Sequence, residues 1–282
     1  TAGHLKRMAV YSGLVAAAMG WGDDEVETLR FVAPLHDIGK VATPDAILLK
    51  TMKLSDSELS AIEYRLAWWV EALKRSSAPE DQVREVLGFV EDIRRANRPS
   101  STQMPEDLQA RIRWIASQTF SDRDGQEKPL LTPEETDKLM VKRGNLTAEE
   151  RSQMEKHTIY GARILAQADS PMMRLAERIA ISHHEKYDGT GYPKGLKGEE
   201  IPIEGRIVAL ADVFDALISK RGYKRGWSLS ETVEFVRREA GGHFDPRVVD
   251  AFLQALPGVQ RAMEDLASQP SSEMAEPPRR AG

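Results

Sequence analysis

Residues 183–193 read His-His-Glu-Lys-Tyr-Asp-Gly-Thr-Gly-Tyr-Pro, and the interpretation of the whole chain starts from this stretch. Two adjacent imidazoles run into a segment that is too rich in glycine and proline to remain helical. Neutral imidazole is the commonest protein ligand for transition metals, and a glycine-rich turn lets backbone approach a ligand closely. An isolated pair of histidines is more often a solvated helix end followed by an ordinary turn. The other histidines of the chain therefore decide between a metal site and a surface feature.

The composition narrows the class of protein. The chain has 282 residues, a formal charge of -5 and no cysteine. A negative charge argues against a dedicated nucleic-acid binder, so no DNA or RNA partner is expected. The lack of cysteine excludes disulfides, thiolate zinc sites and thiol nucleophiles, and fits a reducing cytoplasm. Neither a signal peptide nor an apolar run of the ~20 residues that cross a bilayer is present. We therefore expect a cytoplasmic protein without a membrane segment.

The first residue bears on what precedes the chain. It is Thr1 rather than a methionine. We therefore expect a fragment of a longer protein, with an upstream sensor or receiver domain.

Helical periodicity runs along the chain without strand-like alternation, so the predicted fold class is all-α. The predicted helices and helical turns cover residues 4–19, 23–37, 44–49, 105–117, 133–141, 147–167, 171–184, 205–219, 228–239 and 246–256. Asp23 and Asp24 are the predicted N-cap candidates of the second helix. Residues 121–129 are predicted to form a polar loop. Residues 268–282 are rich in Ser, Pro, Glu and Arg and are expected to form a disordered tail.

The middle of the chain, residues 51–143, contains no histidine and has the pattern of an antiparallel helical hairpin. Its apolar residues recur at three- and four-residue intervals: Leu59, Ile62, Leu66, Trp69, Val70 and Leu73, then Val83, Val86, Leu87, Val90 and Ile93 after Pro79. This pattern indicates an inserted subdomain rather than part of a site. Trp68 and Trp69 suit an interface, but packing within the hairpin or against the core explains them equally well.

The chain contains six histidines: His4, His36, His157, His183, His184 and His243. His243 is expected to mark a helix entry, with Asp245 as N-cap and Pro246 as the first helical residue. The other five lie on predicted helices or helix ends, and helical bundles build metal sites from ligands on several facing helices. Together with Asp37 and Asp212 they form a mixed His/Asp set. Such a set suits Fe, Mn, Zn or Ni better than Ca or Mg.

Several motifs resemble one family. The segment Leu-His-Asp-Ile-Gly-Lys, which contains His36 and Asp37, is similar to the signature of the HD-type metal-dependent phosphohydrolases. Residues 183–193 resemble the hallmark of the HD-GYP subfamily. Further similarity lies at residues 4–7, 146–157, 206–217 and 221–224, where Gly222 replaces the proline of the family's Arg-Pro-Tyr-Lys.

These motifs cover about residues 4–50 and 144–256, and the chain is identified on them as a member of the HD-GYP domain family of cyclic di-GMP phosphodiesterases. The resemblance implies an HD-domain helical bundle as catalytic domain, formed by residues 1–50 and 144–260. Residues 51–143 would then be an inserted helical hairpin subdomain. That insertion would form a homodimer contact, dock a partner, cover the pocket or simply pack on itself.

The resemblance implies a bacterial enzyme that opens cyclic di-GMP to pGpG and often continues to GMP. Seven residues match the family's metal ligands: His4, His36, Asp37, His157, His183, His184 and Asp212. Asp37 would bridge two metal ions, expected to be Fe or Mn, with Zn or Ni as alternatives. Two such ions can share a hydroxide as nucleophile, and Lys40 would add a fixed positive charge at the scissile phosphate. Asp37 and Lys40 are the expected catalytic residues.

Six residues are expected to contact substrate: Lys40, Asp188, Tyr192, Asp215, Arg221 and Lys224. Asp215 follows Asp212 by about one helical turn, so it faces the same site and would contact either substrate or a metal ligand. Some family members hold a third metal with a Glu four residues before the first ligand histidine. Counted back from His4, that position lies before Thr1, so the visible chain supports two metals.

Two alternatives to cyclic di-GMP hydrolysis stay open. One is a phosphodiesterase that prefers a mixed cyclic GMP–AMP or a linear dinucleotide, because nothing in the motifs separates guanine from adenine pockets. The other is a regulatory module that senses a cyclic dinucleotide with little turnover. The complete ligand set and Tyr192 favour an enzyme. These matched site residues carry the claim, because fold resemblance alone does not establish function.

Overall fold

The computed structural model describes residues 2–100, 102–219 and 226–268, and helices dominate these ranges. The predicted all-α class is confirmed. The chain divides into two compact units: the first holds the residues up to Ala42 and from Glu155 onward, and the second is Thr43–Met154. The second unit is thus inserted into the first, and it also takes in residues 43–50 and 144–154, which the sequence assigned to the catalytic domain.

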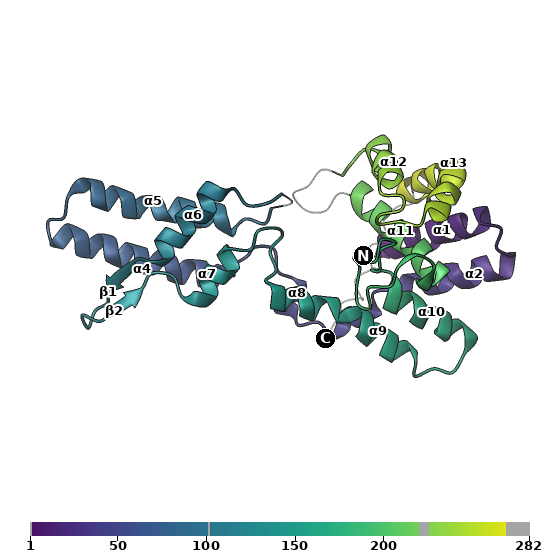
Figure 1. The fold of residues 1–282 in the computed structure, drawn as a ribbon, viewed down its shortest axis with the longest axis horizontal. Coiled ribbons are helices and arrows are strands. Elements are labelled where there is room, and N and C mark those ends of the chain that lie inside the picture. The colour runs from purple at the N-terminus through teal and green to yellow at the C-terminus, as the bar shows by residue number, and fades with distance from the viewer. Residues whose placement is uncertain (1, 101, 220–225, 269–282) are drawn as a thin grey trace, which may run out of the picture. The chain divides into compact units, whose positions relative to one another are not determined.

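The first unit is a bundle of helices around α11 (Figure 1). Its elements are α1 (Ala2–Ala18), α2 (Asp23–Val32), η1 (Ala33–Leu35), η2 (Ile38–Ala42), α9 (His157–Leu165), α10 (Pro171–Ser182), η3 (Gly198–Glu200), α11 (Ile203–Ile218), α12 (Leu229–Arg238) and α13 (Pro246–Ser268). Helix α1 packs against α2, α11 and α13, and α10 packs against α9 and α11. Tyr11, Phe214 and Phe252 are fully buried, and their rings form consecutive edge contacts at 5.5 and 4.9 Å. Helix α11 is buried along most of its length because it is the centre of this core.

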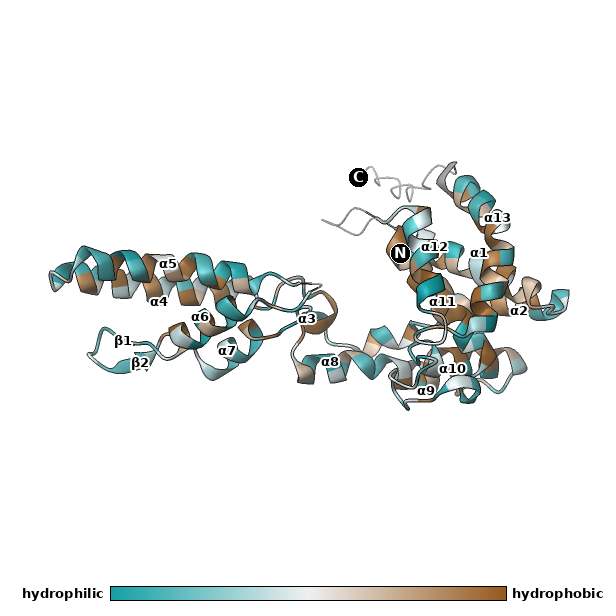
Figure 2. Cartoon of the chain, turned by 45° about the horizontal axis from the view of Figure 1, so that its top comes forward, coloured by the Kyte–Doolittle hydropathy of each residue, from teal (hydrophilic) through white to brown (hydrophobic). Residues whose placement is uncertain are grey.

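The second unit has its own core between helices. Its elements are α3 (Asp45–Leu48), α4 (Asp56–Arg75), α5 (Glu80–Asn97), α6 (Glu106–Ala116), β1 (Thr119–Ser121), β2 (Glu127–Pro129), α7 (Pro133–Leu139) and α8 (Ala148–Glu155). Helices α4 and α5 form the predicted hairpin, and Figure 2 shows apolar residues recurring along both of them. Buried Ile62, Phe89 and Ile112 belong to this core. Trp68 and Trp69 pack partly buried against it, as expected of core aromatics.

One predicted helix, residues 147–167, is in fact two. Helix α8 ends at Glu155 and α9 begins at His157, so His157 occupies the first turn of a helix rather than the middle of one. The Thr158 hydroxyl donates to the Glu155 carbonyl at 2.9 Å and satisfies it at the break. Helix α8 buries no residue, whereas α9 buries His157 and Thr158. Packing on the first unit therefore sets the direction of α9, which periodicity does not predict.

The predicted polar loop 121–129 contains parts of a β-hairpin. Strands β1 and β2 pair antiparallel, with Phe120 opposite Lys128, and Phe120 is buried. Between them, Asp122 accepts from the backbone amides of Asp124 and Gln126, and Gly125 has φ 74°. Strands of three residues are too short to show a period of two in the sequence.

Helix ends differ at two further places. Gly22 is the N-cap of α2, and Asp23 and Asp24 lie in its first turn instead. Helix α13 passes the predicted end at residue 256 and continues through Pro257 to Ser268. Buried Val259 offsets the backbone hydrogen bond that a proline removes. Residues 269–282 of the predicted tail lie outside the described residues.

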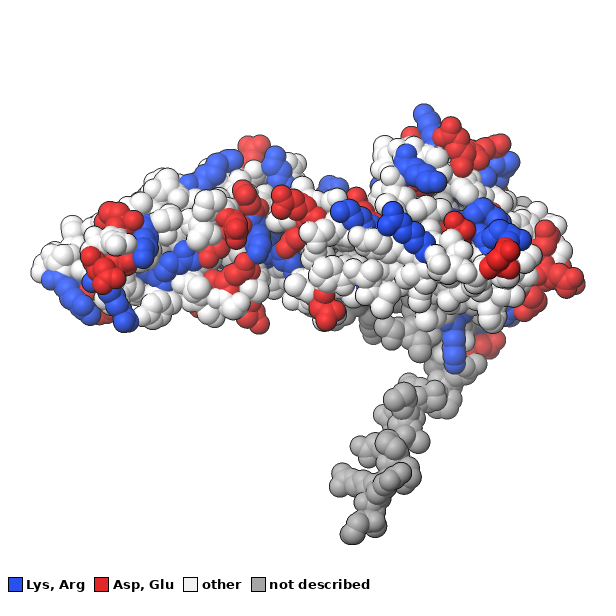
Figure 3. Space-filling view, turned by 90° about the horizontal axis from the view of Figure 1, so that it is seen from below, with Lys and Arg blue, Asp and Glu red and all other residues white. Residues whose placement is uncertain are grey.

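The described helices and surface carry two further observations. None of the helices in the described ranges combines the length and apolar character that a membrane span requires. On the face shown in Figure 3, basic and acidic side chains are intermixed over each unit. That face therefore offers no extended surface of one charge sign.

Candidate metal centre

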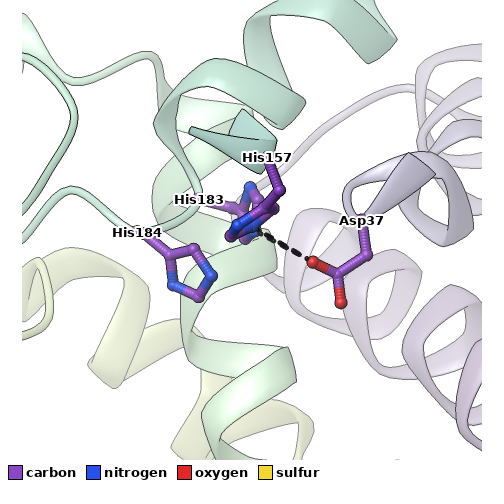
Figure 4. A group of neighbouring side chains, drawn as sticks. All are labelled: Asp37, His157, His183 and His184. Atoms are coloured by element: carbon purple, nitrogen blue, oxygen red, sulfur yellow. Dashed lines mark ion pairs between the residues drawn. The ribbon is translucent and has the colours of Figure 1, made fainter. Parts of the chain in front are cut away.

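Side chains with metal-ligating atoms converge in two groups within the first unit. Asp37, His157, His183 and His184 form one, named the His157 group; His4, His36 and Asp212 form the other, named the His4 group. In each group the ligand atoms lie within 4.8 Å of one another. Figure 4 shows the His157 group, with His157 and His183 directed toward Asp37. The two groups together are the seven residues that the sequence nominated as ligands, and they come from α1, α9, α11, the end of α10 and the turn between η1 and η2.

Asp37 faces both groups with different oxygens. Its Oδ1 lies 3.3 Å from Nε2 of His157 and 3.7 Å from Nε2 of His183. Its Oδ2 lies 3.3 Å from Nε2 of His36, which belongs to the other group. The rings of His36 and His183 are 5.0 Å apart between centroids. A single carboxylate therefore faces both groups of ligand atoms.

The buried imidazoles are oriented with one nitrogen toward the site. His36 Nδ1 lies 2.9 Å from the Ala33 carbonyl, and His183 Nδ1 lies 3.1 Å from the Ala180 carbonyl. These nitrogens donate, so the opposite nitrogens carry lone pairs. Among the described residues, Nε2 of His36, Nε2 of His183 and Oδ1 of Asp37 are buried without a hydrogen-bond partner. Such atoms are costly to bury, and cations bound in the two groups would satisfy them, so the residues fit a metal.

The electrostatics favour a bound cation. Burial would raise the pKa of Asp37, but the neighbouring imidazoles of His157, His183 and His36 outweigh it and hold the pKa far below its usual range. Burial lowers the pKa of His183 and of His184, which leaves both imidazoles neutral and able to ligate at pH 7. For His36 burial also lowers the pKa, but Asp37 outweighs it and the net shift is upward. The site thus attracts positive charge, whether a proton or a metal ion.

A close backbone contact brings the ligands together. A Cβ on Gly39 would lie 1.9 Å from the His157 carbonyl oxygen and 2.3 Å from the Gly161 amide nitrogen. Only glycine allows η2 to lie this closely on α9. Because Asp37 immediately precedes η2 and His157 begins α9, this contact sets their separation.

The loop after His184 is held by a residue that the sequence did not single out. Buried Glu185 accepts from the backbone amides of Lys194 at 2.8 Å and Leu196 at 3.0 Å. The loop turns back so that Tyr192 stacks on His184, with ring centroids 4.8 Å apart. The sequence does contain a signal for this role of Glu185. It is an acidic residue between the histidine pair and a glycine-rich turn, and the backbone amides of such a turn need a hydrogen-bond acceptor.

A cleft of 750 Å³ opens over the two groups. It is lined by His4, Leu5, Arg7, Pro34, Asp37, Ile38, Lys40, His184, Asp212, Asp215, Ala216 and Ser219. Lys40 lies on its wall with Nζ 2.6 Å from Oδ2 of Asp37, and its side chain is 37% exposed. Asp37 and Lys40 are therefore both accessible from the cleft.

The residues that were predicted to contact substrate lie in different surroundings. Asp215 is 1% exposed and its carboxylate binds His4 and Arg7, which is the contact with a candidate ligand that the sequence allowed as an alternative to a substrate contact. Asp188 is exposed but does not line the cleft, and it accepts from the amide and hydroxyl of Thr190 within a turn. Its substrate contact stays a prediction. Arg221 and Lys224 lie outside the described residues.

Comparisons with known proteins identify the family. Two family models, both described as HD domain, match residues 1–117 and 130–248. The chain is 29% identical over 277 residues to the cyclic di-GMP phosphodiesterase response regulator RpfG of Xanthomonas campestris pv. campestris, covering 98% of this chain and 48% of that protein.

Two further relatives carry different substrates in their names. The 3'3'-cGAMP-specific phosphodiesterase 2 of Vibrio cholerae is 46% identical over 254 residues, with 90% of this chain and 31% of that protein covered. The cyclic di-GMP phosphodiesterase of Thermotoga maritima is 48% identical over 118 residues, covering 42% and 32%. The chain spans about half the length of these relatives or less.

Proposed function

Because this chain belongs to the HD-domain family and carries the HD-GYP signature at residues 183–193, we propose that it is a metal-dependent phosphodiesterase of cyclic dinucleotides. The observation that carries the proposal is the convergence of all seven nominated ligands into two adjacent groups that Asp37 connects. Ordinary structural histidines would have their ring nitrogens satisfied by the protein, whereas here buried ligand atoms face one another.

The residues divide the chemistry among them. One ion in each group would supply Lewis-acid activation of water and neutralise the charge that develops on the phosphoryl oxygens. Asp37 holds both groups in register, and its charge balances the ions. Lys40 places a fixed ammonium at the same edge of the cleft, where it can stabilise the charged transition state of in-line displacement.

The types of ligand atom in the two groups indicate which metals the site suits. Five imidazoles and two carboxylates form it, and nitrogen ligands of this kind suit transition metals better than Ca²⁺ or Mg²⁺. The proposed cofactor is therefore a pair of Fe or Mn ions, with Zn or Ni as alternatives. Among the described residues, no further group of ligand atoms accompanies these two.

The proposed substrate is cyclic di-GMP, opened to pGpG and then to GMP. The names of the Xanthomonas and Thermotoga relatives support cyclic di-GMP, whereas the name of the Vibrio relative supports a mixed cyclic GMP–AMP as second candidate. Tyr192 presents its ring beside His184 and so offers an aromatic face for a base or a sugar. Substrate contacts by Arg221 and Lys224, the upstream domain and a homodimer through the insertion remain predictions.

The test is turnover with identification of products. Anaerobically purified protein, reconstituted with Fe²⁺ or Mn²⁺, is incubated separately with cyclic di-GMP and with 3'3'-cGAMP, and products are separated by liquid chromatography. Appearance of pGpG or GMP as the faster reaction supports the proposal. Faster opening of 3'3'-cGAMP would transfer it to the second candidate. Bound metal with neither substrate opened would indicate a sensing module instead.

A further inference from the structure

We propose that Asp215 and Arg7 are positioning residues that hold His4 for the ion of the His4 group, and that they control this ion separately from the ion of the His157 group. The inference deepens the proposed function and rests on it only in taking both groups to bind metal. Neither Asp215 nor Arg7 belongs to the two groups of ligand atoms.

Asp215 sets the orientation of the His4 ring. His4 Nδ1 lies 2.7 Å from Oδ2 of Asp215, while its Nε2 lies 3.6 Å from Oδ1 of Asp212. Because Nδ1 donates to a carboxylate, the lone pair of Nε2 is directed into the His4 group. Asp215 is 1% exposed, so water cannot easily replace it as the acceptor.

His4 depends on this bond more than the other ligands depend on theirs. The Nδ1 atoms of His36 and His183 bond to carbonyls three or four residues earlier in their own segments, so local backbone fixes them. His4 is 20% exposed, lies near the start of α1, and takes its orientation from a side chain on α11. Loss of the Asp215 carboxylate would therefore release one ligand and leave the His157 group intact.

Arg7 fixes Asp215 in turn. Its Nε lies 2.5 Å from Oδ1 and its Nη2 lies 3.0 Å from Oδ2 of Asp215, and Nη2 also donates to the Ser219 hydroxyl at 3.0 Å. A buried carboxylate needs a countercharge, and the two-point contact restricts its rotation. His4 and Arg7 lie one turn apart on α1, so both hold the same carboxylate of α11. The same carboxylate of Asp215 therefore orients the His4 ring and joins α1 to α11.

The experiment measures metal binding without substrate. Metal-free protein is titrated with Mn²⁺ by calorimetry, and retained metal is counted after gel filtration. Wild type is expected to bind two ions. In Asp215→Asn one ion should weaken about 10- to 100-fold, the effect typical of a lost outer hydrogen-bond partner, while the other stays within about twofold. Arg7→Gln should weaken the same ion, and Arg7→Lys should restore part of the loss, since lysine keeps the charge but not the two-point contact.

The matched control is Asp245→Asn. Asp245 is also a buried carboxylate of the first unit paired with an arginine, Arg206, but it contacts none of the seven ligands. It should keep both ions, which separates positioning from a general loss of stability. Wild-type binding of both ions in Asp215→Asn and Arg7→Gln, or equal loss of both ions, would overturn the inference. Two ions in wild type without hydrolysis would instead count against the proposed function and leave this inference in place. A wild type that binds no ions overturns both.

Discussion

Among the described residues, the first unit holds a cluster of ionisable side chains that has no counterpart in the second unit. In the second unit, acidic and basic groups are paired: Lys50 with Glu150 at 2.7 Å, Arg65 with Glu135 at 2.5 Å and Lys138 with Glu58 at 2.5 Å. In the first unit, His36, Asp37 and His183 bury ligand atoms that have no hydrogen-bond partner among the described residues. The paired charges of the second unit stabilise its fold. The unpartnered ligand atoms of the first unit are costly to bury unless an ion binds between them.

This contrast predicts where each unit is sensitive. Changes at the ligands should act on metal content and catalysis, because those atoms contribute little to the fold without an ion. Changes in the second unit should act on stability, because none of the seven ligands lies in it.

The largest effect is expected at Asp37. Asp37→Asn keeps the shape of the side chain but removes the charge that faces both groups. Both ions should be lost or greatly weakened, and kcat/KM should fall by at least about 10³-fold, as His36→Ala should also show. Metal analysis and turnover measure the two effects. Asp45→Asn, on α3 of the second unit, serves as control, and an active Asp37→Asn enzyme would refute the bridging role.

A smaller loss is expected at Lys40. Lys40→Ala removes the ammonium from the cleft without removing a ligand, so both ions should remain while kcat falls roughly 10²–10³-fold. Lys40→Arg should recover part of the rate because it keeps a positive charge. Metal counts alongside kcat separate this role from ligation. Loss of metal in Lys40→Ala would show that the residue supports the site structurally instead.

A chain without residues 51–143 sharpens the comparison of the units. The Lys50 carbonyl accepts from the Asn145 side chain at 2.5 Å, and Lys50 Nζ contacts Glu150, so the two ends of the excision lie close and a short linker can join them. The shortened chain should keep both ions and turnover within a few-fold, because no ligand is removed.

The same variant examines what the insertion does. Its oligomeric state is measured by light scattering beside the wild type. A change from dimer to monomer would support the predicted homodimer contact. Unchanged activity and oligomeric state would remove the regulatory proposals for the insertion, and loss of metal would contradict the separation of the units.

The smallest expected effect is on stability, at Lys53 of the second unit. Lys53 is buried, donates to the Leu139 carbonyl at 3.1 Å, and burial lowers its pKa from 10.5 to about 8. Below pH 8 both folded and unfolded states are protonated, and the fold carries the cost of a buried charge. Between pH 8 and 10.5 the unfolded state binds more protons, so stability rises with pH.

Urea unfolding at pH 7.5 and 9.5 measures this contribution. Wild type should gain about 1–2 kcal/mol relative to Lys53→Met over this interval. Lys74→Met, at an exposed lysine of α4, should follow the wild type. Parallel pH profiles of wild type and Lys53→Met would show that folding does not lower the pKa of Lys53.

The sequence predicted the members of the two groups better than it predicted the contacts that hold them in place. His36, Asp37 and the pair His183–His184 lie in contiguous motifs, so resemblance identified them before any geometry was known. The helical class also followed from periodicity, since α1, α4 and α11 each carry long apolar patterns. Local patterns of this kind are set within one element and are readable from it.

Contacts between distant segments were not readable in the same way. The bond between His4 and Asp215 joins residues 211 positions apart, and the proximity of Gly39 to Gly161 depends on how η2 meets α9. The break at Lys156 has the same origin, because packing rather than propensity ends α8 there. Glu185 acquires its role only when the loop folds back to present its amides.

The central claim is that two adjacent ions, joined by Asp37, are required together. It is tested most directly by adding Fe²⁺ or Mn²⁺ stepwise to metal-free wild-type protein under anaerobic conditions and following cyclic di-GMP hydrolysis against ions bound per chain. Activity should stay low up to one ion and rise steeply to a maximum at two. Full activity with one ion, or two bound ions and no hydrolysis, would contradict it.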